Sequence, residues 1–247
     1  MSPDARRTRR PPKRDFETEG SVPSAPRARQ EARRRPRRSG SIRPLSGGWA
    51  LNPHLGFLLL AGVGLASIRL SHPLRLSLLW LVLLVLILLY AQSGRLKSDY
   101  SLLSVGRGAL IGALVALPFY LFARDFFYST ASWLYSVNDL QVLLERAVFI
   151  VPLLEEGYFR GVVQRERGLV EGAVLFGLAQ ALYFVSAVKV YFAVIAAVVL
   201  GMILAGLLYG YLYKRYGLTA SIAGHVALNF VLFVLPALAA QMTRWLA

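Results

Sequence analysis

Long apolar segments separated by short polar breaks run through most of this 247-residue chain, and they limit what it can fold into. From about residue 49 onward, the apolar segments reach the roughly 20 residues that a helix needs to cross a hydrocarbon core of about 30 Å. Hydrophobic residues make up 56% of the sequence and charged residues 17%, and the mean hydropathy is +0.51. These values exclude an ordinary soluble domain. We therefore expect an all-α fold, a polytopic helical membrane bundle.

About seven transmembrane helices are predicted, each an apolar run that ends in basic or turn-forming residues: residues 49–68, 74–91, 102–123, 140–163, 169–187, 190–213 and 218–242. Arg107, in the first turns of the third span, is expected to snorkel to the interface. The aromatic segment 124–139 fits either an interfacial belt or a short re-entrant helix. Basic breaks at residues 164–167 and 214–215 indicate the cytoplasmic side, which places the amino terminus inside and the carboxyl terminus outside.

The first 45 residues differ in composition from residues 46–247, which we expect to form the transmembrane domain. They contain 14 of the 28 Lys and Arg residues but only 5 of the 13 acidic ones, together with seven prolines. Such a segment cannot bury a core, so a disordered tail is predicted. A basic tail beside a first span is typical of the cytoplasmic face, where it contacts anionic lipids; nucleic acid is the less favoured partner. The use of Arg over Lys and the absence of cysteine indicate a bacterial inner membrane protein.

Two adjacent carboxylates and an arginine interrupt the fourth predicted span: Glu155, Glu156 and Arg160. A charge in the middle of a membrane costs a few kcal/mol or more, so charged residues there usually face the protein interior, pair with one another and mark a functional site. At helical spacing Glu156 and Arg160 are i and i+4 on one face, whereas Glu155 points about 100° away. The pattern predicts one paired carboxylate and one spare.

Polar residues on two later spans reach the same depth as this carboxylate. With a rise of about 1.5 Å per residue, Glu155, Gln180 and His225 each lie roughly 12–18 Å from the nearest cytoplasmic break. Asn229 follows His225 by one turn on the same face, and Gln180 follows Phe176 in the same way. We therefore expect a polar cluster inside the bundle, in the cytoplasmic half to the middle of the bilayer.

These residues form three motifs, which occur in this order on the fourth, fifth and seventh predicted spans: Glu155-Glu156-x-x-x-Arg160, Phe176-x-x-x-Gln180 and His225-x-x-x-Asn229. The motifs resemble those of the CAAX-processing and bacteriocin-processing intramembrane protease family, also called the Abi family. The resemblance covers about residues 140–235, and the extended first motif, Glu-Glu-x-x-Phe-Arg-Gly, is its most specific part. Members are similar to the type II CAAX prenyl endopeptidases, which remove a C-terminal tripeptide. Bacterial relatives are implicated in peptide maturation, bacteriocin immunity and the processing of C-terminal membrane anchors.

The resemblance implies an intramembrane endopeptidase, a hydrolase that cleaves a membrane-anchored or lipidated protein or peptide near the cytoplasmic side. Glu155 matches the family's catalytic glutamate and would take a proton from the attacking water. Arg160 would keep Glu156 ionised, and His225 and Asn229 would bind the water or the developing oxyanion.

One position departs from the family pattern, because the second motif normally ends in histidine and here ends in Gln180. The only other histidines, His54 and His72, lie in or beside the first two predicted spans. A zinc site needs three good protein ligands, and glutamine is a poor one. The absence of cysteine also excludes cysteine-ligated metals and thiol nucleophiles. We therefore expect no metal and no other cofactor, with zinc disfavoured, and a Gln180 that donates from its amide but cannot shuttle a proton.

Two other functions stay open at this point. A catalytically impaired member could act as a binding or chaperoning membrane protein, and a transporter would be favoured by discontinuous helices in matching halves, although no such repeat is visible. Phe176 and Tyr158 are candidate substrate contacts, with core packing as the alternative interpretation.

Overall fold

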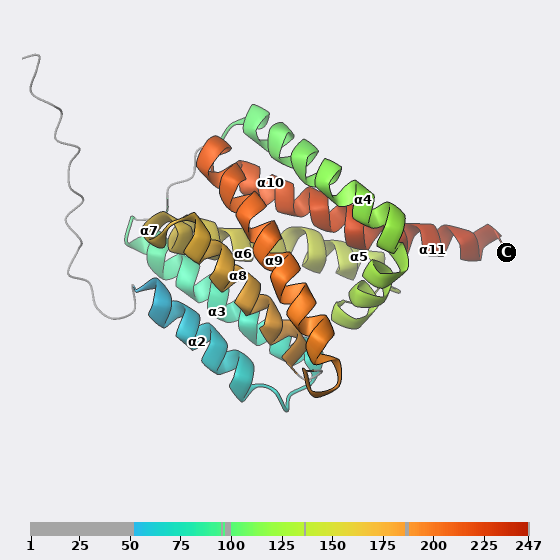
Figure 1. The fold of residues 1–247 in the computed structure, drawn as a ribbon, viewed down its shortest axis with the longest axis horizontal. Coiled ribbons are helices and arrows are strands. Elements are labelled where there is room, and N and C mark those ends of the chain that lie inside the picture. The colour runs from blue at the N-terminus through green and yellow to red at the C-terminus, as the bar shows by residue number, and fades with distance from the viewer. Residues whose placement is uncertain (1–51, 95, 97–99, 136, 186–187, 247) are drawn as a thin grey trace, which may run out of the picture. The chain divides into compact units, whose positions relative to one another are not determined.

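The computed structural model describes residues 52–94, 96, 100–135, 137–185 and 188–246. The predicted tail of residues 1–45 lies outside the described residues. Within these ranges every regular element is a helix, and consecutive helices join into seven continuous stretches (Figure 1). By length and composition, four helices can cross a membrane: His72–Gln92, Leu102–Leu134, Phe192–Tyr216 and Leu218–Thr243. The predicted all-α membrane bundle is confirmed.

The first three stretches are single helices, and so are the fifth and sixth: α2 (Pro53–Ala66), α3 (His72–Gln92), α4 (Leu102–Leu134), α8 (Leu169–Phe184) and α9 (Val188–Tyr216). The fourth and seventh stretches each change helix type along their length. The fourth consists of α5 (Leu140–Leu143), η2 (Leu144–Ile150), α6 (Val151–Tyr158), η3 (Phe159–Gln164) and α7 (Arg165–Arg167). The seventh consists of α10 (Leu218–Asn229), η5 (Phe230–Val234) and α11 (Leu235–Leu246), and the η segments are π-helical.

The observed helix ends follow the predicted spans closely, with one extension. Helix α4 continues eleven residues beyond the predicted end at Ala123, so that most of the aromatic segment 124–139 is helical. Its backbone bends at Ala123, where φ is −132° and ψ is 26°. The breaks before α8 and α10 are made by Gly168 and Gly217, whose φ angles of 99° and 90° are readily adopted only by glycine.

The fourth stretch lies at the centre of the bundle (Figure 1), and the first of its π-helical segments, η2, has a local cause. Pro152 has no backbone N–H and cannot donate to the carbonyls one turn before it. The Val151 N–H bonds to the Arg146 carbonyl, five residues back, which leaves the Ala147 carbonyl without a donor from its own helix. The Asn229 side chain of α10 supplies that donor, at 2.7 Å from the Ala147 oxygen. A wide turn therefore lies just before the double glutamate, and α10 holds it.

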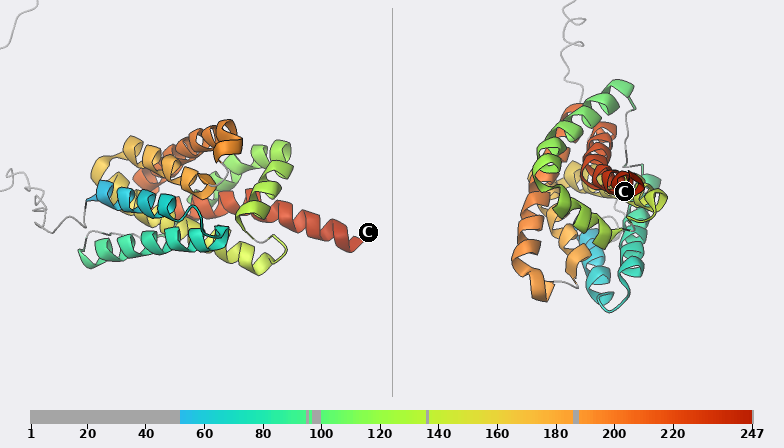
Figure 2. Two further views of the ribbon diagram at one scale, coloured as in Figure 1. Left: turned by 90° about the horizontal axis from the view of Figure 1, so that it is seen from below. Right: turned by 90° about the vertical axis from the view of Figure 1, so that its right-hand side faces the viewer.

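Helices α4 and α10 lie side by side at very close range (Figure 1, Figure 2). A β-carbon added at Gly108 would lie 2.1 Å from the carbonyl oxygen of Ala220, and one added at Gly112 would lie 2.1 Å from that of Gly224. Small residues four apart are the usual means by which membrane helices approach this closely. The contact sets the position of α10, which carries His225.

The close contact between α4 and α10 gives a stability prediction with a control on the same helix. Gly112→Ala should lower the melting temperature in detergent, because an added methyl group overpacks the contact at a cost of about 1–3 kcal/mol. Gly106→Ala is the control, since nothing lies within 4 Å of a β-carbon added there. That change should leave stability unchanged or raise it, as alanine is the better helix former by about 1 kcal/mol. Equal melting temperatures for both variants would contradict the close packing.

Candidate active site

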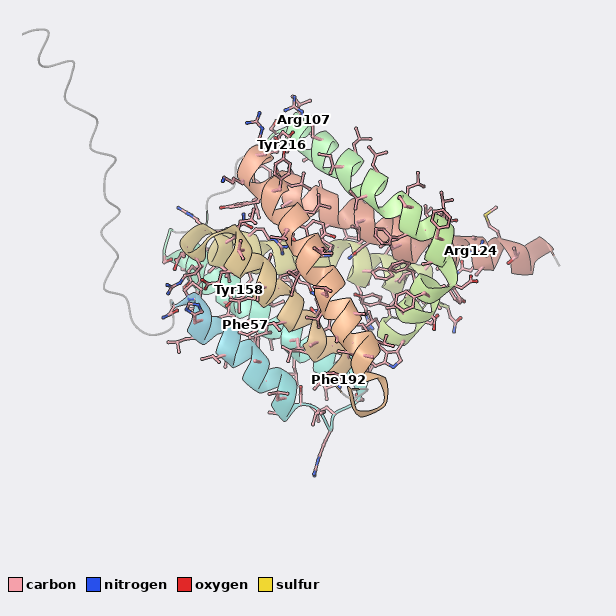
Figure 3. All side chains as sticks on the ribbon, in the orientation of Figure 1. Phe57, Arg107, Arg124, Tyr158, Phe192 and Tyr216 are labelled. Carbon is pink, nitrogen blue, oxygen red and sulfur yellow. The ribbon has the colours of Figure 1, made fainter. Side chains whose placement is uncertain are left out.

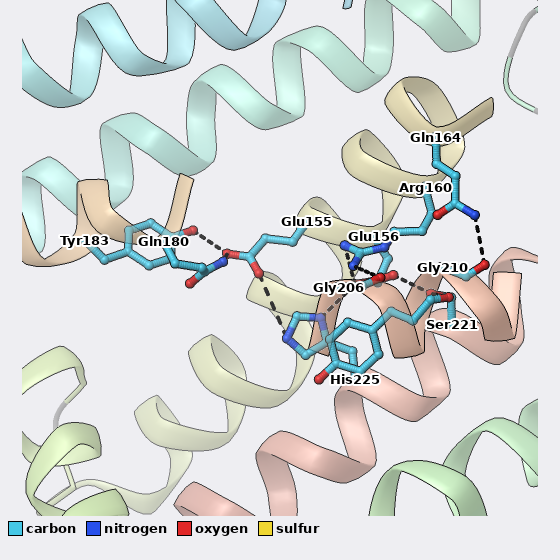
Figure 4. Close-up of polar contacts among 11 residues, drawn as sticks. Glu155, Glu156, Arg160, Gln164, Gln180, Tyr183, Gly206, Gly210, Ser221 and His225 are labelled. Carbon is cyan, nitrogen blue, oxygen red and sulfur yellow. Dashed lines mark hydrogen bonds and ion pairs between the residues drawn. The ribbon is translucent and has the colours of Figure 1, made fainter. Parts of the chain in front are cut away.

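The two adjacent glutamates of α6 turn to different partners (Figure 4). Glu156 is fully buried and lies among three polar side chains. Its Oε1 is 3.1 Å from Arg160 Nη1 and 3.0 Å from His225 Nδ1, and its Oε2 accepts a hydrogen bond from the Ser221 hydroxyl. The predicted i, i+4 pair is present, and it is anchored to α10 at two points.

Arg160 joins this pair to α9. Its Nη2 donates to the Gly206 carbonyl at 3.1 Å, and its guanidinium carbon lies 4.2 Å from the centre of the Phe176 ring. One turn further along, Gln164 Nε2 donates to the Gly210 carbonyl at 2.8 Å. Two parallel hydrogen bonds four residues apart therefore hold the central stretch against α9, and the arginine charge is satisfied by a carboxylate, a carbonyl and a ring face.

Glu155 has one oxygen that accepts hydrogen bonds and one that does not. Its Oε1 accepts from Gln180 Nε2 at 3.0 Å and from the Tyr183 hydroxyl at 2.6 Å. Its Oε2 is buried and accepts no hydrogen bond from the described residues; it lies 3.9 Å from His225 Nε2. A carboxylate fixed by one oxygen with the other free to act is the arrangement that a general base requires.

His225 lies between the two glutamates and is held in orientation by a carboxylate and two aromatic rings. Its Nδ1 is within hydrogen-bond distance of Glu156, which directs Nε2 toward Glu155. The Tyr209 ring stacks on the imidazole, with centroids 4.5 Å apart and planes 16° apart, and Phe176 meets it edge-on. A carboxylate that accepts from one imidazole nitrogen fixes the tautomer and leaves the other nitrogen for chemistry.

The structure brings five of the predicted site residues into one connected cluster: Glu155, Glu156, Arg160, Gln180 and His225. Of the other three, Phe176 packs against two members of the cluster, Arg160 and His225, and the remaining two have separate contacts. Asn229 donates to the Ala147 carbonyl, Phe176 packs in the core beneath Arg160, and Tyr158 donates from its hydroxyl to the Pro53 carbonyl at 2.8 Å. Phe176 and Tyr158 are fully buried, so their predicted contact with substrate stays a prediction.

Three contributing residues were not singled out from the sequence: Tyr183, Ser221 and Tyr209. Two of them had a usable signal, since Tyr183 follows Gln180 by three residues and Ser221 precedes His225 by four, which places each on the face of a motif residue. Tyr209 had none, because no motif lies on α9. Its buried hydroxyl has no partner among the described residues, and its carbonyl oxygen lies 3.0 Å from Ser221 Oγ.

The polar side chains of this cluster can be compared with the ligands that a zinc ion requires. Within the described ranges, no three His, Asp or Glu side chains are arranged to hold a metal. Glu156 is taken up by Arg160, His225 and Ser221, and Glu155 Oε2, which accepts no hydrogen bond from the described residues, lies 3.9 Å from His225 Nε2. A catalytic zinc requires three good protein ligands, so this cluster does not fit one.

Comparison with known proteins bears on the part of the chain that contains the cluster. Residues 138–231, less than half of the chain, match the family model described as type II CAAX prenyl endopeptidase Rce1-like. The matched range includes all three motifs, and the resemblance inferred from them is confirmed. No match was found among curated proteins or among solved structures.

The buried ion pair gives the second stability prediction. Arg160→Met keeps much of the side-chain volume but leaves the Glu156 carboxylate without its cation. We expect the free energy of unfolding to fall by about 3–5 kcal/mol, the usual consequence of removing one partner from a buried pair. Denaturant unfolding in micelles measures the change.

Arg107→Met serves as the control for the loss of an arginine. Arg107 lies over the Tyr216 ring, 5.5 Å from its centre, at the edge of the bundle (Figure 3). Its replacement should change stability by no more than about 0.5 kcal/mol. Adding Glu156→Gln to Arg160→Met should restore part of the lost stability, because the charge to be paired is gone. Strictly additive losses would argue against the pairing.

Proposed function

We propose that this chain, which resembles the CAAX-type intramembrane proteases over residues 138–231, is an endopeptidase that hydrolyses a membrane-anchored peptide with a water molecule activated by Glu155. The family match supports a protease in general terms. The finer proposal is supported by one observation above all: a buried carboxylate oxygen, Glu155 Oε2, that accepts no hydrogen bond from the described part of the chain and faces an imidazole nitrogen 3.9 Å away.

Two atoms at that separation can both hydrogen-bond to one water molecule, each at about 2.8 Å. Such a water would have Glu155 Oε2 on one side and His225 Nε2 on the other. Glu155 cannot turn away readily, since Gln180 and Tyr183 hold its second oxygen. The proton acceptor and the water are thus oriented before substrate binds, which avoids part of the entropic cost of assembling them in the transition state.

The proposed reaction takes place in two steps. Glu155 removes a proton from the water as the water oxygen attacks the peptide carbonyl carbon, and a tetrahedral oxyanion forms. Glu155 then transfers that proton to the amide nitrogen, the carbon–nitrogen bond breaks, and a carboxylic acid and an amine leave. A protonated His225 can donate from Nε2 to the oxyanion, a type of interaction that is worth a few kcal/mol in other enzymes.

Glu156 serves this step without touching substrate. Its Oε1 lies 3.0 Å from Nδ1 of the adjacent His225 and orients the ring, while Arg160 stabilises Glu156 itself. The role resembles that of a buried carboxylate which orients a catalytic histidine. Ser221 supports the carboxylate from α10.

The position of the cluster supports a substrate class and a side of cleavage. Glu155 is on a helix between π-helical turns inside an apolar bundle, which favours a substrate that is itself in the membrane. A lipid-anchored or transmembrane peptide meets that requirement. The basic residues at the ends of two stretches, such as Arg167 and Lys214, favour a cytoplasmic opening and a cytoplasmic amino terminus, as expected of a protein in a bacterial inner membrane.

The proposal predicts that Glu155→Gln removes activity and leaves the fold intact. The amide has the same shape as the carboxylate but cannot take a proton, so the cleavage rate should fall by at least about a hundredfold, within the usual range for loss of a general base. A quenched fluorescent peptide with a prenylated CAAX-type carboxyl terminus, in liposomes, reports the rate. Glu171→Gln, the same change at a partly exposed site on α8, is the control and should keep parental activity. Undiminished cleavage by Glu155→Gln would refute the assignment.

A second prediction concerns Gln180 and metals. Because the cluster lacks a third ligand, chelators should leave the cleavage rate of the parent unchanged, and metal analysis should find no stoichiometric zinc. Gln180→His, which restores the family residue, should raise the rate, since an imidazole can accept and donate a proton. Cleavage only after Gln180→His would identify the parent as a catalytically impaired binding protein. Tightly bound zinc in the parent would overturn the argument from ligand number.

A further inference from the structure

Helix α3 carries an arginine that the proposed reaction does not use. The Arg75 side chain is only 1% exposed, and its contacts in the described part of the chain are neutral. Its Nη2 donates to the Tyr183 carbonyl at 2.9 Å and lies 2.9 Å from His72 Nδ1. A buried cation without a carboxylate is expensive, so an apolar side chain would be expected at this position unless the arginine has a role.

The carbonyl that Arg75 binds is at a particular place in its helix. Tyr183 is the second-last residue of α8, and the last four carbonyls of a helix have no acceptor role within it. These carbonyls carry the negative end of the helix dipole, which a nearby cation stabilises. Arg75 therefore caps α8 from a neighbouring helix and fixes where α8 ends.

A second contact path fixes the same helix end. His72, which accepts from Arg75, lies with its ring centroid 4.3 Å from that of Trp133 on α4. Trp133 in turn stacks on Phe184, the residue after Tyr183, at 5.1 Å and nearly parallel. Both α3 and α4 thus hold the last turn of α8 in position.

Tyr183, whose carbonyl Arg75 binds, also holds the carboxylate of Glu155, the proposed base. Tyr183 receives the Arg75 hydrogen bond on its carbonyl and donates from its hydroxyl to Glu155 Oε1 at 2.6 Å. Its side chain has only two rotatable bonds, so the place of the hydroxyl depends on the place of the backbone. We propose that Arg75 is a positioning residue that sets the orientation of Glu155 through Tyr183. The expected effect on the cleavage rate rests on the proposed function.

The inference extends the site beyond its motif-bearing segment. Arg75 lies outside residues 138–231, and nothing in the sequence around it distinguishes it from an arginine at a membrane interface. Its effect should appear in the chemical step rather than in substrate binding, because it touches the backbone behind the base and not the oxygen that faces the water.

A double-mutant cycle tests the inference with four proteins: the parent, Arg75→Met, Tyr183→Phe and the combined variant. We expect each single change to lower kcat by about tenfold, equivalent to about 1.4 kcal/mol, with little change in KM. The combined variant should be at most about threefold slower than the slower of the two single variants, because both changes remove the same effect. Arg75→Lys should recover part of the rate, as an ammonium can still donate to the carbonyl.

Leu79→Ala is the matched control. Leu79 is one turn along α3 and fully buried, so its truncation weakens the bundle without removing the hydrogen bond to the Tyr183 carbonyl. Combined with Tyr183→Phe, it should lower the rate by the product of the two single effects. Multiplicative losses for Arg75→Met as well would show that the arginine supports only the fold and would overturn the inference.

Two further readouts separate the remaining outcomes. If Arg75→Met raises KM only for peptides with a free terminal carboxylate and not for their amides, the arginine binds substrate and the positioning role is wrong. Fluorotyrosine at position 183, observed by ¹⁹F NMR, reports the surroundings of the tyrosine without any turnover. Its signal should shift in Arg75→Met and not in Leu79→Ala. An unshifted signal overturns the inference, whereas an inactive parent with the expected shift refutes the proposed function alone.

Discussion

The buried ion pair of Glu156 and Arg160 is the interaction on which the rest of the site depends. Both side chains are fully buried, so neither charge could be kept without the other. The pair also determines what surrounds it, since the remaining hydrogen-bonding groups of the two residues need partners in a membrane interior. Ser221 and His225 supply partners to Glu156 from α10, and the Gly206 carbonyl supplies one to Arg160 from α9. An ion pair within one helical stretch therefore contacts α9 and α10, which are distant in the sequence.

Glycine makes these long-range contacts geometrically feasible. Carbonyls on α9 accept side chains from the central stretch at Gly206 and Gly210. A β-carbon added at Gly210 would lie 2.7 Å from Gln164 Oε1, and one added at Gly206 would lie 3.0 Å from the Ala173 backbone of α8. On the opposite side, glycines of α4 let α10 approach until backbone meets backbone. In a bilayer, close packing and hydrogen bonds rather than hydrophobic exclusion hold helices together. The positions of α9 and α10, and hence of His225, depend on that packing.

Two neighbouring carboxylates receive different environments although they share a helix. Glu156 is surrounded by donors and acts as a fixed negative charge, whereas Glu155 has donors on one oxygen and an open second oxygen. The separation follows from helix geometry, because side chains one residue apart point about 100° away from each other. One helix turn thus holds a carboxylate that is paired on both oxygens and, among the described residues, a carboxylate with one oxygen free.

The sequence by itself determined the helical membrane fold, the pairing of Glu156 with Arg160 and the common depth of Glu155, Gln180 and His225. These follow from apolar run length, from i, i+4 spacing and from rise per residue, all of which are local properties. The tertiary structure alone decided how the helices are rotated against one another.

That rotation selects Tyr183 and Gln180 as the partners of Glu155 and directs Asn229 to the carbonyl that Pro152 leaves without a donor. It also brings Arg75, more than a hundred residues away in the chain, to the end of α8. Such contacts depend on side-chain packing between helices, which periodicity within a single helix does not encode.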